Sequence, residues 1–121
     1  MAGWTADELD RIGRADELRV AGMRNDGSLR HSVVIWVVRL GDEIYIRSVN
    51  GPTAAWYRGS QIRGEGRIEA GGVTRDVTFV RSADKDDEVD AAFRAKYGGG
   101  SPVRAITSDV ARSTTLRVDP R

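Results

Sequence analysis

The residues of this chain that could do chemistry are arginines, hydroxyls and large aromatics, and they stand close together in the sequence. Nine of them lie between positions 30 and 58: Arg30, Ser32, Trp36, Arg47, Ser48, Asn50, Trp56, Tyr57 and Arg58. Guanidinium and hydroxyl groups bind phosphate, and aromatic faces stack on planar rings. The set is therefore typical of a binding site for a flat heterocycle that carries a phosphate. We assign no catalytic acid, base or nucleophile within it.

The basic residues of the chain are almost all arginine. Lys85 and Lys96 are the only lysines among the 19 basic side chains. One interpretation is the codon usage of a GC-rich bacterial genome. The other is that some of these planar, permanently charged side chains bind phosphate or carboxylate. Arg30, Arg47 and Arg58 are the candidates, because they fall beside the aromatic residues.

Other patterns in the sequence carry less weight. The glycine run 98–100 and the pair Gly64 and Gly66 lack the spacing of a phosphate-binding loop. The acids at 84–88 lack the twelve-residue loop of a calcium site, and a solvated helix start explains them. His31 could act as a base, but the sequence offers it no partner. We interpret it as a surface or interface histidine.

Composition excludes several classes of protein. A length of 121 residues fits one domain, which we place over residues 1–121. The absence of cysteine and the single histidine argue against a disulfide scaffold, a thiol nucleophile and a metal site. A net charge of +1 gives no support for nucleic-acid binding. No apolar run reaches the roughly 18 residues of a membrane span, and no signal peptide is evident, so we expect a cytoplasmic protein without membrane contact.

Turn signals and hydrophobic periodicity predict six strands, over residues 16–23, 30–40, 43–49, 63–70, 73–82 and 113–118. A capping box from Thr5 to Glu8 begins an N-terminal helix. Further helices are expected over residues 52–61 and 84–97, and residues 101–109 form a loop or a helical turn. The predicted fold is mainly β (α+β): a six-stranded antiparallel split β-barrel with short helices at the N-terminus, after strand 3 and between strands 5 and 6.

The turn at Gly41 and Asp42 fixes which side chains of the first hairpin share a face. A two-residue turn predicts four facing pairs: Leu40 with Glu43, Val38 with Tyr45, Trp36 with Arg47, and Val34 with Val49. The predicted outward-facing side chains are Val34, Trp36, Val38, Tyr45 and Arg47. The opposite face is the expected barrel interior and carries Val33, Ile35, Val37, Ile44, Ile46 and Ser48. An outer face this apolar needs a cover. A helix of the same chain, a homodimer partner and a planar ligand all remain open as that cover.

The second hairpin places Arg67 opposite Asp76 and leaves Gly64 and Gly66 in a strand interior. Glycine weakens a strand, so the pair needs a reason. One reason is a bend of the barrel at which facing side chains cover the gaps. The other is that the missing side chains leave room for a bulky ring.

Five segments, in order along the chain, resemble those of a small bacterial family of unknown function. They are Ile35-Trp36-Val37-Val38, Tyr45-Ile46-Arg47-Ser48-Val49-Asn50-Gly51, Ala55-Trp56-Tyr57-Arg58, and residues 90–98 and 113–118. That family is grouped with the flavin-binding split-barrel superfamily, whose members are similar to pyridoxamine-phosphate oxidases and deazaflavin-dependent nitroreductases. The resemblance implies FMN or a deazaflavin, bound on the outer barrel surface at a homodimer interface. In one departure, Asn25 and Asp26 stand where the nitroreductase branch has a Lys-Ser-like turn, which places an acid near any phosphate.

Three functional hypotheses follow from the residues and the resemblance together. The first is a homodimeric oxidoreductase that holds FMN or a deazaflavin and acts on a small molecule. Its arginines and serines would hold phosphate or ring edges, and Trp36, Trp56 and Tyr57 would wall the ring. The second is a non-catalytic module that binds another small molecule. The third is a cofactor-free homodimeric domain whose aromatic face is an interface.

Overall fold

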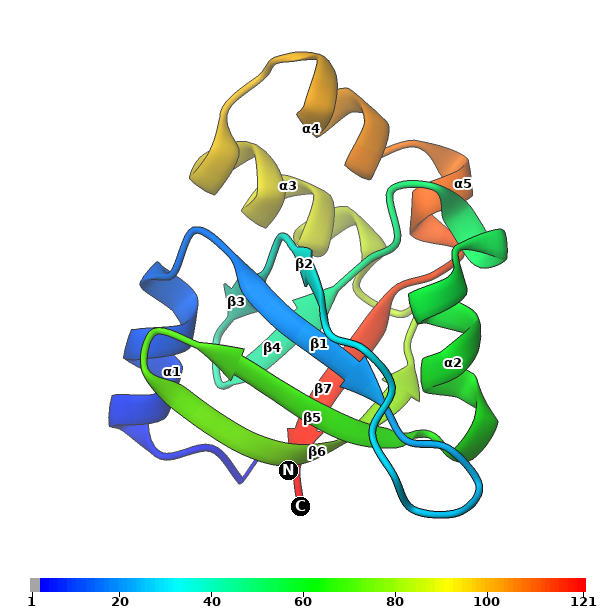
Figure 1. Ribbon diagram of the computed structural model, residues 1–121. Helices are drawn as coiled ribbons and strands as arrows, with labels where there is room; N and C mark the ends of the chain where they lie inside the picture. Colours follow the sequence, from blue (N-terminus) through cyan, green and yellow to red (C-terminus); the bar gives the residue numbers. More distant parts are fainter. Residues whose placement is uncertain (1–2) are drawn as a thin grey trace.

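The computed structural model describes residues 3–121, which are built on one curved antiparallel sheet (Figure 1). The seven strands of this described part follow the order β2-β1-β5-β6-β7-β4-β3. Their bounds are β1 Leu18–Gly22, β2 Val33–Ile35, β3 Val38–Leu40, β4 Glu43–Ile46, β5 Glu65–Ala70, β6 Val73–Arg81 and β7 Leu116–Pro120. Because β2 and β3 lie at the two ends of the order and only Trp36 and Val37 separate them, the sheet rolls into a half-barrel.

The prediction of six strands was wrong by one, because the predicted strand 30–40 breaks into two. β2 pairs with β1, whereas β3 pairs with β4. At the break, two residues of helix α3 (Asp86–Tyr97) hold the backbone of Val37. The amine of Lys96 donates to the Val37 carbonyl at 2.7 Å, and the Tyr97 hydroxyl accepts from the Val37 N–H at 3.3 Å. These side chains replace a neighbouring strand as partners, so the backbone of Val37 stays paired at the break.

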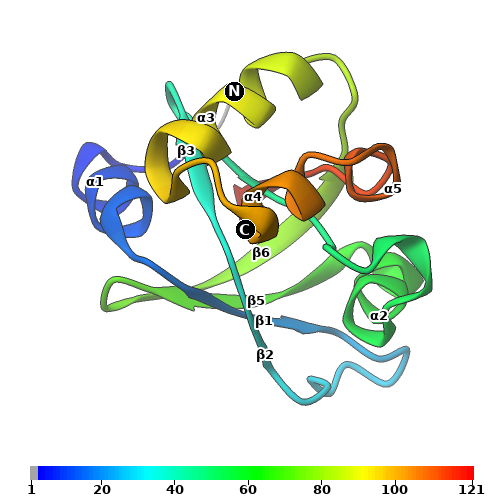
Figure 2. The same ribbon diagram turned by 90° about the horizontal axis from the view of Figure 1, so that it is seen from above.

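Short helices fill the connections between the strands of residues 3–121. Their bounds are α1 Ala6–Arg14, the 3-10 turn η1 Gly51–Thr53, α2 Ala55–Arg63, α3 Asp86–Tyr97, α4 Ser101–Ile106 and α5 Asp109–Arg112. The capping box at the start of α1 is confirmed, with Thr5 and Glu8 each accepting from the other's backbone N–H. Helices α1 and α2 lie at opposite ends of the sheet, and α3, α4 and α5 lie together over one side of it (Figures 1 and 2).

The hairpin registers were predicted correctly where the strands are continuous. Val38 lies opposite Tyr45, and Arg67 lies opposite Asp76 with 2.8 Å between their charged atoms. The predicted pairs Trp36–Arg47 and Val34–Val49 do not form, because β2 pairs with β1 and places Val34 opposite Arg19 instead.

Of the two glycines predicted in a strand interior, only Gly66 lies in a strand, because Gly64 ends α2 with a left-handed backbone at φ 69°. The missing side chain of Gly66 is explained by packing. A Cβ on Gly66 would clash with the carbonyl oxygen of Ala21 and lie 2.8 Å from the ring of Phe79. The Phe79 side chain therefore covers the gap, as expected for a bend of the barrel. It leaves no room there for the ring of a ligand.

Two hydrophobic cores pack on the two faces of the sheet. The main core, inside the half-barrel, includes Leu18, Val37, Ile44, Ile46, Val77 and Leu116. The second lies between the β3–β4 hairpin and helices α3 to α5, and contains Val38, Tyr45, Val89, Phe93, Ile106 and Ala111. Helices of the same chain thus cover Val38 and Tyr45 of the predicted outer face. Val34 stays 42% exposed and Trp36 is half-buried, so helices α3 to α5 do not cover the part of the outer face that carries these two residues.

Candidate functional site

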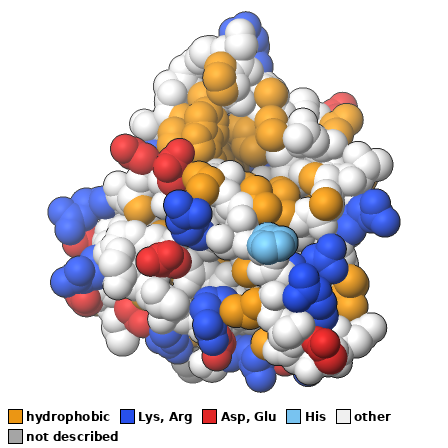
Figure 3. All heavy atoms as spheres, viewed as in Figure 1, with side chains coloured by type: hydrophobic (Ala, Val, Ile, Leu, Met, Phe, Trp, Pro, Cys, Tyr) orange, Lys and Arg blue, Asp and Glu red, His pale blue; other side chains and the backbone are white. Residues whose placement is uncertain are grey.

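A cavity of about 250 Å³ opens where the helical cover ends, between β2, the end of β4, the start of α2 and helix α4. Its lining residues are Val34, Ile35, Trp36, Arg47, Ser48, Val49, Asn50, Trp56, Pro102 and Ile106. Figure 3 shows hydrophobic side chains gathered around a hollow in this part of the surface. An apolar cleft with a few polar groups is the usual form of a small-molecule site. We call this cavity the aromatic cavity, after its two tryptophans.

A second cavity of about 180 Å³ adjoins the first and is basic. Its lining residues are Gly22, Arg24, Arg30, His31, Val33, Ala55 and Trp56. Trp56 lines both cavities, so the two share this residue as part of their walls. We call this second space the basic cavity.

The structure brings together most of the nine predicted site residues, but not all. Five of them, Trp36, Arg47, Ser48, Asn50 and Trp56, line the aromatic cavity, and Arg30 lines the basic cavity. Tyr57 is buried in the main core, where it supports Trp56 with a perpendicular ring contact at 6.0 Å. Ser32 and Arg58 are exposed and line neither cavity.

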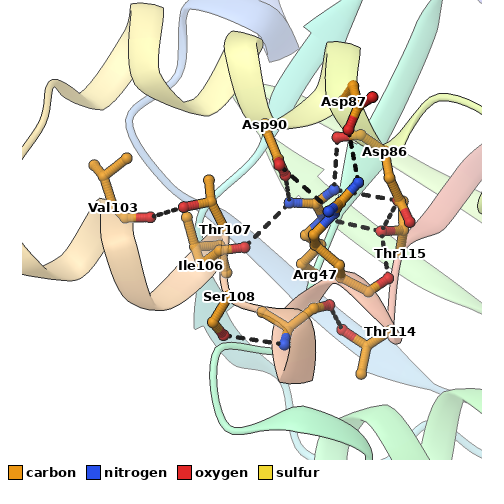
Figure 4. A network of polar contacts seen from close by, with 12 residues as sticks. Arg47, Asp86, Asp87, Asp90, Val103, Ile106, Thr107, Ser108, Thr114 and Thr115 are labelled. Atoms are coloured by element: carbon orange, nitrogen blue, oxygen red, sulfur yellow. Dashed lines mark hydrogen bonds and ion pairs between the residues drawn. The ribbon is translucent and has the colours of Figure 1, made fainter.

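Arg47 is fully buried, and all of its hydrogen-bond donors are engaged within the protein (Figure 4). Its Nε donates to Thr115 Oγ1 at 2.9 Å. One terminal nitrogen donates to the Asp90 carboxylate and to the Ile106 carbonyl, and the other donates to the carbonyl and the carboxylate of Asp86. A guanidinium has five N–H groups, and these contacts use all five. Arg47 therefore has no donor left for a phosphate or for the edge of a ring.

The role of Arg47 is to hold the walls of the cavity together. Its partners lie 39 to 68 residues away in the sequence, on α3, on α4 and at the start of β7. Asp86 and Asp90 balance its charge, and Arg112 adds a contact of 3.6 Å to Asp90. Because Ile106 is both a partner of Arg47 and a lining residue, this network sets the position of α4 at the cavity.

Ser48 is the fully buried polar side chain of the aromatic cavity that has no partner among the described residues. Its residue is fully buried, and its backbone N–H donates to Thr114 Oγ1 at 2.8 Å. Its side-chain Oγ makes no hydrogen bond to any residue of the described chain. Buried hydroxyls are almost always paired, so this one is a candidate partner for a molecule in the cavity that Ser48 lines.

The tryptophan walls of the cavity are held by packing. Trp36 stacks on Tyr97 with their ring centroids 4.0 Å apart and their planes at 4°. The Tyr97 hydroxyl donates to the Asp16 carbonyl at 2.8 Å, and burial raises the pKa of Tyr97, which keeps this donor protonated. One face of Trp36 is thus occupied and its orientation is fixed before any ligand arrives.

The basic cavity lies against the start of α2. Arg30 packs along this helix at Gly59, where a Cβ would come within 2.6 Å of the arginine side chain. The residue that precedes α2 is Ala54, which offers no side-chain acceptor to the first N–H groups of the helix. Free N–H groups at a helix start and a guanidinium are both favourable to an anion.

The acid in the turn before Arg30 is engaged within that turn. One Asp26 oxygen accepts from the backbone N–H of Ser28 at 2.9 Å and from its hydroxyl at 2.6 Å. These bonds, that from the hydroxyl first, lower the pKa of Asp26. Arg24 donates to the Leu29 carbonyl at 2.7 Å. The turn is therefore a closed unit, and it contributes Arg24 rather than Asp26 to the basic cavity.

Sequence reasoning missed the contribution of α4. Pro102 and Ile106 line the aromatic cavity from this helix, in a segment expected to be a loop or a single turn. The signal was present: Pro102 suits the first turn of a helix, and Val103 and Ile106 are spaced three apart, as on one helix face. Both of those apolar side chains are buried.

The described residues contain neither a cluster of metal ligands nor a membrane-spanning helix. Among residues 3–121, no group of three or more histidine, cysteine, aspartate or glutamate side chains is arranged to hold a metal ion. In the same range, no helix has the length and apolar character needed to cross a membrane.

The fold and the cavity define a split-barrel protein, and solved structures share this fold. HutZ, described as the heme storage protein from Vibrio cholerae, is similar with a TM-score of 0.68 at 12% identity, over 93% of this chain and 86% of that one. An F420 reductase gives a TM-score of 0.58 at 12% identity, over 93% and 91% of the two chains. A conserved hypothetical protein from Mycobacterium tuberculosis gives 0.64 at 12% identity, over 95% and 78%.

The chain belongs to the family described as "Uncharacterized protein conserved in bacteria (DUF2255)", whose model matches residues 8–118. The predicted membership of a small bacterial family with a split-barrel fold is therefore confirmed. A search among curated proteins found no match.

Proposed function

We propose that this protein binds a flavin-type cofactor, FMN or a deazaflavin, through its two adjoining cavities. The observation that carries the proposal is that an apolar cavity walled by Trp36 and Trp56 shares Trp56 with a cavity lined by two arginines. The planar ring would lie in the aromatic cavity, and the phosphate would lie beside Arg30 at the start of α2. Structures that bind heme or use F420, by their descriptions, share the fold and support this class of ligand.

The residues of the site bind and orient rather than exchange protons. Of the described residues that line the aromatic cavity, only Arg47 is ionisable, and its N–H groups are all engaged. When bound, a flavin or deazaflavin itself supplies the electron-transfer chemistry. The chain would hold the ring between apolar walls, exclude water from one side and fix its edge. Because the cofactor would transfer the electrons and the chain would bind and orient it, the favoured function is that of an oxidoreductase that acts on a small molecule.

The lack of a free acid or base at the aromatic cavity also favours a second candidate, a non-catalytic module that stores or carries its ligand. The two candidates differ in turnover. An oxidoreductase with bound cofactor transfers electrons from a reduced nicotinamide donor or to a small acceptor such as a nitroaromatic compound. A carrier binds the same ligand and gives rates equal to those of the free cofactor.

A second copy of the chain is the proposed cover for the open side of the aromatic cavity. Val34 and Val49 line this cavity and are 42% and 47% exposed. Exposed apolar side chains that rim a cavity favour burial against a partner. A homodimer would enclose the ring between two protomers. A dimer that binds neither FMN nor a deazaflavin would instead support a cofactor-free structural domain.

The test is a titration of the purified protein with FMN, a deazaflavin and hemin, followed by absorbance and fluorescence. The proposal predicts saturable binding of a flavin, and Arg30→Ala weakens FMN binding by at least about tenfold, since a charge-assisted contact to phosphate is lost. Arg94→Ala is the matched control, because Arg94 is exposed on α3 outside both cavities. Binding of hemin but of neither flavin would refute the flavin proposal and indicate heme as the ligand. The absence of binding for all three would also refute the proposal.

A further inference from the structure

Among the described residues, the aromatic cavity has one buried hydroxyl without a hydrogen-bond partner, and its one charged side chain has all of its donors engaged. Ser48 Oγ is buried and unpaired among the described residues. Arg47 lies beside it in the sequence, but its five N–H groups bond to Thr115, Asp90, Ile106 and Asp86. The cavity therefore offers a neutral partner and no free cationic donor.

We infer that the aromatic cavity selects an uncharged planar ring whose edge carries a polar atom, and that Ser48 Oγ is the specificity-determining group that bonds to this atom. The inference rests on the proposed function for the identity of the cavity as the ring site. It goes further by assigning the charge of the bound group and the residue that recognises it. Anionic parts of a ligand are left to the basic cavity and Arg30.

The exclusion of anions follows from desolvation. A charged group that enters an apolar cavity loses its hydration and needs direct donors in return. The remaining lining residues, apart from Ser48 and Asn50, offer only hydrocarbon and indole surfaces, and Asn50 is exposed at the rim. Asp86 and Asp90 already balance the charge of Arg47. A carboxylate or phosphate in this cavity would therefore keep an uncompensated charge.

The recognition by Ser48 follows from its hydroxyl, which both donates and accepts. A ring carbonyl can accept from Oγ–H, and a ring N–H or hydroxyl can donate to the oxygen. Losing one neutral hydrogen bond of this kind weakens binding by about two- to tenfold. In the free protein the same hydroxyl is a buried group without a partner, so its removal does not lower the stability of the fold.

The test compares the wild type with Ser48→Ala by calorimetric titration with lumiflavin and with 2-naphthol, two neutral rings with polar edges. The inference predicts that both probes bind the wild type and that both bind Ser48→Ala about two- to tenfold more weakly. 2-Naphthoate, which has the same ring and a carboxylate, binds the wild type more weakly than 2-naphthol. Thr74→Ala, which removes an exposed hydroxyl on β6 outside the cavity, leaves all affinities unchanged.

Thermal unfolding of the free proteins gives the second readout. Ser48→Ala unfolds at a temperature equal to or a few degrees above that of the wild type, because the removed hydroxyl had no partner. A Ser48→Ala protein with lower Tm, unchanged affinity for both probes, or a wild type that prefers 2-naphthoate would each overturn the inference. Failure of lumiflavin to bind while 2-naphthol binds through Ser48 would refute the flavin proposal and leave this inference standing. Failure of both neutral rings to bind would overturn the inference.

Discussion

Replacing Arg47 by alanine is predicted to lower the stability of the fold far more than replacing an exposed arginine such as Arg67. The substitution leaves Asp86 and Asp90 beside an empty space, with Asp90 buried in it. Removing one partner of a buried ion pair costs about 3 to 5 kcal/mol, because the remaining charge stays buried and unpaired. That is a large share of the roughly 5 to 15 kcal/mol that stabilises a typical domain.

The expected change in Tm follows from the length of the chain. With roughly 2.1 cal/mol/K of unfolding entropy per residue, 121 residues give about 0.25 kcal/mol per degree, so Tm falls by about 12 to 20 °C. Arg47→Lys is intermediate, because an ammonium keeps the charge but supplies three donors in place of five. Circular dichroism followed against temperature and against urea measures both variants.

Arg67→Ala is the matched control for this prediction. Arg67 pairs with Asp76 at 2.8 Å on the exposed surface of the second hairpin. Exposed ion pairs contribute about 0.2 to 1 kcal/mol, so this variant loses only about 1 to 4 °C. An Arg47→Ala protein that is as stable as Arg67→Ala but no longer binds flavin would refute the structural role and make Arg47 a ligand-binding residue.

Three further predictions concern the fold. Phe93→Ala removes a fully buried ring from the second core and lowers the unfolding free energy in urea by about 3 to 5 kcal/mol; a loss below about 1 kcal/mol would contradict that core. Gly66→Ala places a Cβ against the Ala21 carbonyl and lowers the yield of folded protein, whereas Gly99→Ala, which meets nothing within 4 Å, is tolerated. The backbone N–H of Thr5 and the side chain of Arg75 lower the pKa of Glu8, so Glu8 stabilises the fold above its usual pKa of 4.5 and this contribution is lost as pH falls below it. Glu8→Gln therefore flattens the acid side of a plot of Tm against pH, and an unchanged slope would contradict the capping box.

The parts of the fold that local sequence determines were predicted correctly. The capping box at Thr5 and Glu8 and the two-residue turn at Gly41 and Asp42 need only neighbouring residues, and both are present. The break between β2 and β3 depends on Lys96 and Tyr97, about 60 residues away, which bond to the Val37 backbone. No local pattern in residues 30–40 indicates that contact, so the segment reads as one continuous strand.

In the candidate site, too, residue type and local sequence predicted some features correctly, whereas contacts between distant residues determine the others. The aromatic residues Trp36 and Trp56 were found from their type and spacing, and they do line the aromatic cavity. Residue type alone also suggested Arg47 as a phosphate ligand, because a guanidinium suits that role. Its actual partners come from α3, α4 and the start of β7, and only the folded chain brings them together. The net charge of the whole chain is close to zero, so it gives no indication of the basic cavity at Arg24 and Arg30.

The proposed function requires that one flavin-type cofactor occupy both cavities. The most direct measurement is a fluorescence titration of FMN with the wild type and with Arg30→Ala, in parallel with lumiflavin, which lacks the phosphate. We expect saturable binding of both flavins to the wild type, and a loss of at least about tenfold for FMN but not for lumiflavin in Arg30→Ala. Equal loss of both ligands, or no binding of FMN to the wild type at micromolar protein, would contradict it.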